Sequence, residues 1–347
     1  MRVLNTRSIV DEIFTAELAA SGPVQRLDFL GRGNADVYRV AAGGRNFIAH
    51  VSLDGTEYLK RLRANLEALA VLRDDRIPRE AAWRKANGAW AVLVYPEIPG
   101  AELNRSNAAG AALDQLGDLL LRLHSVEDPG LPSDSLSWRV NEPAAFAAFG
   151  DMLVHRVADL PIRRDRVRRH LDVMAEFLAE HRSEFEIPTR LIHGDLHRSN
   201  IVSTGTRIGL LDWADLTAGD YAFDLAALKF ILDSVAPHKS IEFIRARARA
   251  YRERFHDGSL EVRMRFFLAL AGLVRAVNCA DDITAFRPGR AWRVRACYLH
   301  SEAQWRVPFE IDGAAPSAPV ARTEDFAVDM RQPIRGLFYL VAPKRVG

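Results

Sequence analysis

The spacing of apolar residues changes twice along the first part of the chain. Residues 6–20 place Ile9, Ile13 and Leu18 on one side of a helix. Residues 24–52 read instead as short strands at 25–30, 37–41 and 46–52, separated by glycine-containing loops at 31–34 and 43–44. This pattern is typical of a β-meander. Helical spacing returns at 55–72, and residues 90–95 form an apolar strand that ends at Pro96.

Helical spacing dominates the rest of the chain. It predicts helices at 108–123, 142–160, 166–185, 220–233, 241–255 and 260–279, with strand-like pieces at 191–192 and 208–211. The stretch PEIPG at 96–100 is the best candidate for a linker. We therefore predict an α+β fold of two lobes. The expected domains are a β-rich N-terminal lobe over 1–95, a hinge at 96–101, a mainly helical lobe over 102–307, and an extension of unknown role at 308–347.

Length and composition narrow the class of protein. A chain of 347 residues with 48% hydrophobic and 27% charged residues can bury more than one core. The longest apolar run, 266–274, is about half of a bilayer span, and the N-terminus lacks the apolar core of a signal peptide. We expect a cytoplasmic protein without membrane contact.

The net charge of +2 does not indicate a nucleic-acid partner, and Cys279 and Cys297 are too few for a disulfide framework. No oligomeric state is predicted.

The segment LIHGDLHRSNIV at 191–202 concentrates polar residues between two apolar strands. It is followed by GLLDW at 209–213. Phosphoryl transfer requires an acceptor for the proton of the nucleophile, oxygen ligands for magnesium, and donors to the phosphates. The carboxylate of Asp195 suits the first role. The amide oxygen of Asn200 and the carboxylate of Asp212 suit the second.

Two histidines in this segment allow another interpretation. His193 and His197 are four residues apart, as zinc ligands on a helix can be. Gly194 and the preceding strand argue against a continuous helix there. We therefore interpret His193 as a buried residue that orients the loop, and His197 as a partly exposed one.

The motif resembles the aminoglycoside phosphotransferase family, relatives of the protein kinases. The family pattern is His-Gly-Asp, four residues, then Asn, with a strand ending in Asp-Trp downstream. GDYAFDLA at 219–226 is similar to a second family segment. The resemblance implies a two-lobed protein-kinase-like fold, Asp195 as the base, Asn200 and Asp212 as Mg²⁺ ligands, and ATP or GTP as the phosphate donor. It also implies that Asp220 is a brace beneath the catalytic loop.

A glycine-containing loop stands where a kinase-like fold covers the nucleotide phosphates. Gly31, Gly33 and Asn34 precede the strand at 37–40, and glycines let backbone amides approach phosphate oxygens closely. On its own such a loop is an ordinary hairpin. Its position upstream of the Asp195 segment favours nucleotide binding.

The chain departs from the family at the next strand. By resemblance this strand carries a lysine or arginine that contacts the phosphates and pairs with a helix glutamate, whereas here the position is His50. A neutral imidazole carries no charge. Either His50 is protonated in the complex, or Arg45 or Lys60 substitutes, or transfer is slow or absent. Glu67 is the candidate helix partner.

The hinge is expected to hold the base of the nucleotide. By resemblance Tyr95 lies at the back of the base pocket, and the Pro96 carbonyl and Ile98 amide face the base. A bulky Tyr95 favours guanine over adenine. The alternative for Tyr95 is a half-buried strand tyrosine without such a role.

The predicted acceptor is a hydroxyl of an antibiotic or related natural product of the aminoglycoside, nucleoside or macrolide class. A basic chain does not indicate a polycation site, although four acidic residues could line one locally: Glu242, Glu261, Asp281 and Asp282. One alternative is a metabolic kinase for choline, an amino-acid alcohol or a sugar. An aromatic cage would favour choline, and its candidates are Trp138, Trp292 and Trp305. The other alternative, motivated by His50, is a pseudokinase that binds without transfer.

Overall fold

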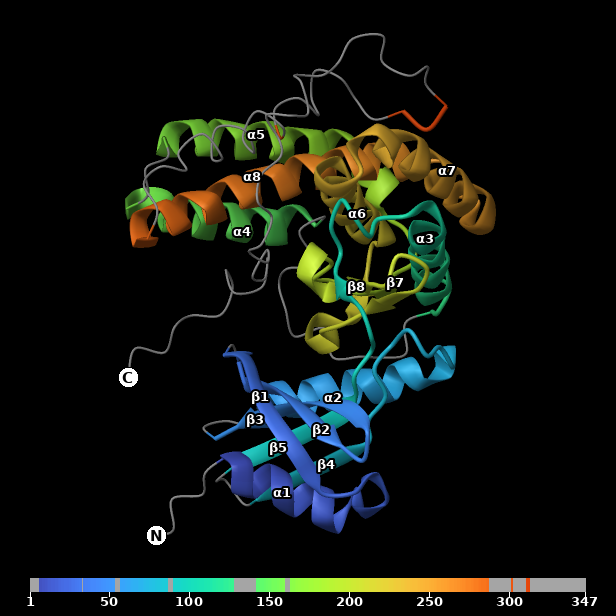
Figure 1. Ribbon diagram of the computed structural model, residues 1–347. Coiled ribbons are helices and arrows are strands. Elements are labelled where there is room, and N and C mark those ends of the chain that lie inside the picture. The colour runs from blue at the N-terminus through green and yellow to red at the C-terminus, as the bar shows by residue number, and fades with distance from the viewer. Residues whose placement is uncertain are drawn as a thin grey trace. The chain divides into compact units, whose positions relative to one another are not determined.

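The computed structural model in Figure 1 describes residues 6–32, 34–53, 57–86, 90–127, 142–159, 163–286, 301 and 310–312. The chain divides into two compact units. The first comprises residues 1–101 together with 201–215, and the second comprises 102–200 together with 216–347. Among the described residues, no helix is both long and apolar enough to cross a membrane.

The first unit contains a five-stranded antiparallel sheet with the order β1-β2-β3-β5-β4. Its strands are β1 (Val24–Arg32), β2 (Asp36–Ala42), β3 (Arg45–Ser52), β4 (Ala82–Ala86) and β5 (Trp90–Pro96). Four of them follow the predicted pattern. The fifth, β4, was not predicted, because its sequence AWRKA has no apolar alternation. It pairs only with β5, as an edge strand.

Two helices cover the two faces of this sheet. The apolar stripe of α1 (Thr6–Ala16), which includes Ile13 and Phe14, packs on one face in a core with Phe47 and Val94. Since side chains alternate along a strand, His50 on β3 points to the other face. There it meets α2 (Glu57–Leu69), whose buried side includes Leu59 and Leu62.

A hairpin from later in the chain completes the first unit. It consists of β8 (Ile201–Ser203) and β9 (Ile208–Leu210) and precedes the 3₁₀ turn η7 (Trp213–Asp215). Leu210 N donates to Arg76 O over 2.9 Å. Gly100 has a φ of +147°, and a Cβ there would lie 2.9 Å from Ser203 N. Only glycine therefore lets the end of the predicted hinge approach the hairpin.

The second unit is mainly helical. Its helices are α3 (Gly110–His124), α4 (Pro143–Arg156), α5 (Arg164–Glu180), α6 (Tyr221–Val235), α7 (Pro237–Phe255) and α8 (Leu260–Phe286), and β7 (Arg190–Ile192) pairs with β10 (Thr217–Gly219). Helices α6 and α8 are apolar on most sides, as expected of helices at the centre of a core. They pack on each other, with α7 against α6 and α5 against α8.

The remaining short elements of the two units are β6 (Ala101–Glu102) and the 3₁₀ turns η1 (Ala19–Ser21), η2 (Ala70–Leu72), η4 (Val157–Asp159), η5 (Arg182–Phe185) and η6 (Arg198–Asn200).

A buried arginine ties α8 to the beginning of α6. Arg263 Nε donates to Asp220 Oδ2 over 2.7 Å, and its Nη2 donates to Asp257 Oδ2 over 2.6 Å. Burial opposes the positive charge of Arg263, but Asp220 and Asp257 more than offset this and raise its pKa. Burial alone would raise the pKa of Asp257, but the hydrogen bond and charge of Arg263, together with the hydrogen bonds of Tyr221 and Ser259, outweigh this and hold its pKa at about 2. Arg263, Asp220 and Asp257 form an ion network inside the second unit.

We expect Arg263→Met to lower the free energy of unfolding by about 3 to 5 kcal/mol, because two buried carboxylates lose their cation. Urea denaturation at pH 7 measures this. The matched control is Arg249→Met on α7, since Arg249 pairs with Asp312 in an exposed ion pair, and such pairs contribute only about 0 to 1 kcal/mol. Equal unfolding free energies for the two variants would contradict the expectation.

Candidate functional site

A loop at residues 193–200, which we call the aspartate loop, follows β7 in the second unit. Asp224 on α6 holds its first turn: His193 N donates to Asp224 Oδ2 over 2.7 Å, and Gly194 N donates to Oδ1 over 3.1 Å. His124 Nε2 lies 3.0 Å from the same Oδ2. With 0% of its surface exposed, Asp224 acts as the internal acceptor for this loop.

The residue beneath the loop is therefore Asp224, whereas Asp220 was the predicted brace. Asp220 caps the N-terminus of α6 by accepting a hydrogen bond from Ala222 N, and its other oxygen binds Arg263. Both of its oxygens are thus engaged within the helical core. Asp224 lies one turn further along α6, where a side chain reaches the aspartate loop.

The environment keeps Asp224 ionised. Burial alone would raise the pKa of this carboxyl, but the hydrogen bond and charge of His124, together with the His193 backbone donor, lower its pKa below the usual range. On the far side of the ring, His124 Nδ1 lies 2.7 Å from the hydroxyl of Tyr251. A buried chain Tyr251–His124–Asp224 thus supports the backbone of the aspartate loop.

Asp195 lies in the middle of this loop, and its side chain is 13% exposed. Asp195 N donates to His193 Nδ1 over 3.3 Å, and Asn200 Nδ2 donates to Asp195 O over 3.0 Å. The ring of His193 is buried, as a loop-orienting residue requires. Because the amide nitrogen of Asn200 is used within the loop, its Oδ1 is the atom of this side chain that can accept a hydrogen bond or bind a metal.

His197 was expected to be partly exposed, but the structure buries it. Only 7% of its surface is exposed, and its Nε2 lies 3.4 Å from Asp195 Oδ2. Within the described part of the chain, no three or more His, Cys, Asp or Glu side chains gather as a metal site would require. His193 and His197 are both buried, and they lie in the aspartate loop on either side of Asp195.

The predicted metal ligand Asp212 lies in the first unit, after β9. Its φ of +55° is uncommon for a residue other than glycine and marks backbone strain of the kind that gathers at functional sites. Tyr58 OH donates to Asp212 Oδ1 over 3.2 Å. Asn65 lies on α2, as Tyr58 does, and its Nδ2 donates to Trp213 O over 2.8 Å and to Ala214 O over 3.1 Å. Helix α2 thus positions the segment that carries Asp212.

His50 on β3 lies close to Tyr58 of α2 and to Tyr95 of β5, and we call these three residues the cluster around His50. It is 6% exposed, its Nε2 lies 2.7 Å from the hydroxyl of Tyr95, and its ring centroid lies 6.5 Å from that of Tyr58. Among the described residues its Nδ1 has no hydrogen-bond partner. Burial lowers the pKa of His50, and the charge of Asp212 opposes this only in part. The imidazole is therefore neutral at pH 7.

The other two cations considered for the phosphates are engaged elsewhere. The Arg45 guanidinium lies 5.3 Å from the centre of the Phe47 ring, on the α1 face of the sheet. Lys60 pairs with Glu57 at the exposed start of α2. In the structure neither side chain is paired with the cluster around His50.

The structure does not bring Glu67 to His50. The Glu67 side chain is 57% exposed and pairs with Arg63. The α2 residue that faces His50 is Tyr58, and nine residues separate it from Glu67. At about 100° per residue this spacing puts the two on opposite sides of the helix. Sequence reasoning missed Tyr58 and Asn65, although a polar residue inside an apolar helical stripe was a signal for Asn65.

The low pKa of His50 has a measurable consequence. The unfolded chain protonates this histidine below about pH 6.5, whereas the folded chain resists, so stability falls as the pH decreases through that value. The slope is at most about 1.4 kcal/mol per pH unit. We expect His50→Gln to remove this component, so that urea unfolding of wild type and variant diverges between pH 8 and pH 5. Parallel curves would show that His50 does not titrate this way.

The remaining predicted nucleotide residues lie along β1 and β5. Gly31 sits at an irregularity of pairing between β1 and β2, and Asn34 is exposed in the loop that follows; Gly33 lies outside the described residues. Tyr95 is fully buried, whereas the alternative interpretation expected a half-buried tyrosine, and its hydroxyl forms a hydrogen bond with His50. Pro96 ends β5, and Ile98 packs against Gly209 of the hairpin.

Two of the four acidic residues considered for a polycation site lie in the described part of the chain. Glu242 is exposed on α7, and Glu261 on α8 accepts a hydrogen bond from Ile311 N. The other candidates lie outside what the structure describes: the side chains of Asp281 and Asp282, and the tryptophans Trp138, Trp292 and Trp305.

The comparison with protein families identifies the chain. The sequence model of the phosphotransferase enzyme family, APH, matches residues 27–267, well over half of the protein. The chain belongs to this family. No curated protein matches the sequence.

Solved structures agree with the fold of this phosphotransferase. A thermostable mutant of aminoglycoside phosphotransferase APH(4)-Ia is 15% identical, with a TM-score of 0.57 over 84% of this chain and 98% of the other. The GDP complex of aminoglycoside 2'-phosphotransferase-IIIa is 17% identical, with a TM-score of 0.58 over 87% and 99%. Amicoumacin kinase hAmiN, in complex with AMP-PNP, Ca²⁺ and Ami, is 16% identical, with a TM-score of 0.59 over 88% and 99%. These likenesses confirm the α+β, kinase-like fold.

Proposed function

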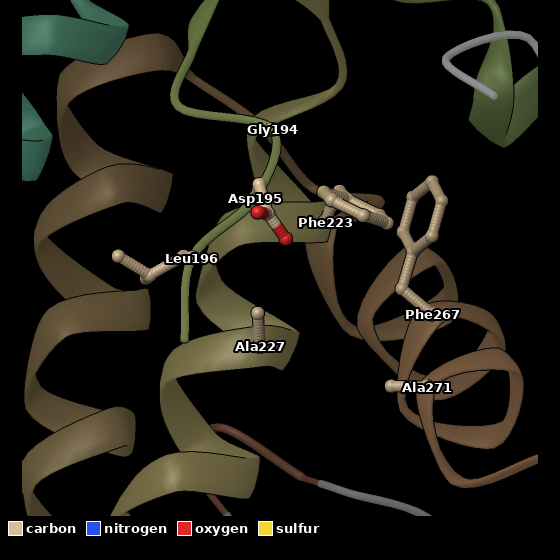
Figure 2. A pocket seen from close by; sticks show the side chains of 7 residues that line it. All are labelled: Gly194, Asp195, Leu196, Phe223, Ala227, Phe267 and Ala271. Carbon is tan, nitrogen blue, oxygen red and sulfur yellow. The ribbon is translucent and has the colours of Figure 1, made fainter. Parts of the chain in front are cut away.

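We propose that this phosphotransferase moves the γ-phosphate of ATP or GTP to a hydroxyl of an antibiotic or related natural product. One observation carries the proposal: the Asp195 carboxylate lines a pocket in the second unit, on a loop that Asp224 and Asn200 hold in place (Figure 2). A carboxylate fixed beside a pocket suits a group that receives a proton from a bound alcohol. The printed names of solved relatives, which include aminoglycoside and amicoumacin kinases, support a small-molecule acceptor.

The proposed step is a direct transfer. The acceptor oxygen attacks the γ-phosphorus, its proton passes to the carboxylate of Asp195, and the bond between the γ-phosphorus and the bridging oxygen breaks, so that the nucleoside diphosphate leaves. Asp195 holds the received proton until water removes it. The neighbouring His197 limits the freedom of the carboxylate.

Each of the two proposed metal ligands offers an atom that suits Mg²⁺. The Oδ1 of Asn200 remains available because its amide nitrogen is bound to the loop, and Asp212 retains one oxygen beyond the one that Tyr58 holds. Few, hard oxygen ligands are what Mg²⁺ uses when nucleotide phosphates complete its coordination. A bound Mg²⁺ would neutralise charge on the phosphates. The proposed ligands are therefore Asn200 and Asp212.

Nucleotide contacts are proposed for the loop at Gly31 and Asn34 and for the end of β5 at Tyr95, Pro96 and Ile98. The buried, neutral His50 offers a hydrogen bond in place of the cation of the family. The size of Tyr95 favours guanine at the base pocket. Thermal-shift titration with magnesium and either ATP or GTP compares the two nucleotides.

The proposal is tested by nucleotide turnover. Purified protein with Mg²⁺ and ATP or GTP is assayed against aminoglycosides, macrolides and nucleoside antibiotics, and phosphorylated product is identified by mass spectrometry. Transfer to any of them supports the proposal. Nucleotide binding without transfer to any acceptor would instead support the pseudokinase alternative, and absence of both binding and consumption would defeat the kinase claim.

A further inference from the structure

The pocket beside Asp195 is built from one loop and two helices of the second unit. Figure 2 shows Asp195 projecting between the helices, with the two phenylalanine rings to one side and the alanines below. The enclosed cavity among the lining residues is small, about 20 Å³, and continues into open solvent. The described lining residues are Gly194, Asp195, Leu196, Phe223, Ala227, Phe267 and Ala271.

The two helices line the pocket in the same way. Helix α6 contributes Phe223 and Ala227, and α8 contributes Phe267 and Ala271, each pair four residues apart and hence on one helix face. The Phe223 and Phe267 rings meet edge to face, with centroids 5.6 Å apart. Phe267 also packs against Phe266, so its ring is held in place. The alanines leave room where larger side chains would fill the pocket.

The pocket offers little to a polycation. Of the seven described residues that line it, Asp195 alone is ionisable. Asp224, the next residue after Phe223, has no exposed surface and serves the loop backbone. Among these described lining residues, an acceptor rich in ammonium groups finds one carboxylate, and the proposed reaction already uses it.

We propose that the acceptor presents an apolar ring or alkyl face to Phe223 and Ala271, next to the hydroxyl that meets Asp195. This inference rests on the proposed function and narrows its substrate class. Acceptors of the macrolide or nucleoside kind carry such a face beside free hydroxyls. The polycationic aminoglycosides, whose rings are covered with ammonium and hydroxyl groups, do not.

The test compares acceptors in the full-length protein. We expect kcat/KM with erythromycin or a nucleoside to exceed that with kanamycin by about tenfold or more, the difference that a hydrophobic pocket typically confers. We also expect Ala271→Leu to raise the KM for the preferred acceptor about tenfold, because the added side chain occupies its space. The matched control is Ala246→Leu on α7, where the alanine is exposed; it should behave as wild type.

The outcomes separate the two claims. If kanamycin is phosphorylated as well as the apolar acceptors, or if Ala271→Leu leaves acceptor KM unchanged, the apolar acceptor class is wrong while the kinase function stands. If nucleotide binds but wild-type protein phosphorylates none of the acceptors, the proposed function itself fails. The kinase function and the apolar acceptor class are both supported if the apolar acceptor is preferred tenfold and if KM rises in Ala271→Leu but not in Ala246→Leu.

Discussion

Replacing Asp195 with asparagine should lower the rate of phosphate transfer by about 10²- to 10⁴-fold, the contribution typical of a positioned general base. The amide has nearly the shape of the carboxylate but cannot take up the proton of the acceptor. Nucleotide binding should stay near the wild-type level, because the proposed metal ligands and the nucleotide loop are unchanged. Single-turnover transfer and equilibrium nucleotide binding, measured on the same preparation, separate the two effects.

A matched control for this variant is Asp114→Asn, on the exposed surface of α3. Asp114 pairs with Arg247, and its side chain is largely exposed, so removal of its charge should leave transfer unchanged. If Asp195→Asn transfers phosphate at the wild-type rate, Asp195 is not the proton acceptor. If Asp195→Asn instead loses nucleotide binding, the aspartate has a structural role that the proposal does not include.

The second large effect is expected for Asp224→Asn. Two backbone N–H groups and the ring of His124 converge on this buried carboxylate. An amide offers a single acceptor oxygen and turns its own N–H donors toward the remaining donors. Removal of one partner from a buried charged network typically costs about 3 to 5 kcal/mol. We expect a loss of that size in the free energy of unfolding, together with loss of transfer, because the aspartate loop loses its support.

Urea denaturation and transfer assays at a temperature where the variant remains folded measure both effects. Asp118→Asn is the matched control, since Asp118 lies on α3 with a largely exposed side chain paired to Arg247. A stable Asp224→Asn variant that transfers phosphate normally would show that the loop holds its shape without this acceptor.

Much of the fold was predictable because its elements follow simple periodicities. The β-meander at β1, β2 and β3 and the helices of the second unit carry regular apolar spacing. Their ends match to within five residues, except that α8 runs seven residues further than predicted. The aspartate loop was predictable for a different reason: it is a contiguous stretch whose polar residues sit between apolar strands. Short strands without their own apolar pattern, such as β4, escape this kind of reasoning.

The errors in the site concern residues whose roles depend on tertiary contacts. Asp220 and Asp224 are both aspartates at the start of one helix, and sequence alone does not show which carboxylate turns toward the loop. Tyr58 and Glu67 lie on opposite sides of α2. Which of these sides faces His50 depends on how the helix packs on the sheet. The burial of His197 follows from the fold of the loop around Asp195.

The proposed acceptor pocket was the least predictable part. Phe223, Ala227, Phe267 and Ala271 come from two helices some forty residues apart in sequence, and each reads in isolation as an ordinary core position. Their common pocket becomes visible only when the packing of α6 against α8 is known. The net positive charge of the chain does not indicate a site for a polycation. Among the described residues that line the pocket, only Asp195 is ionisable.

The late hairpin at 201–215 has a consequence for synthesis of the protein in the cell. The first unit needs this segment, through Arg76, Gly100 and Asn65, yet more than a hundred residues separate it from β5. A nascent chain that has emerged only as far as Ala101 therefore lacks part of its own core. The N-terminal unit should reach its native state only after the ribosome has released residue 215, so helices α3, α4 and α5 of the second unit are made while the first is still incomplete.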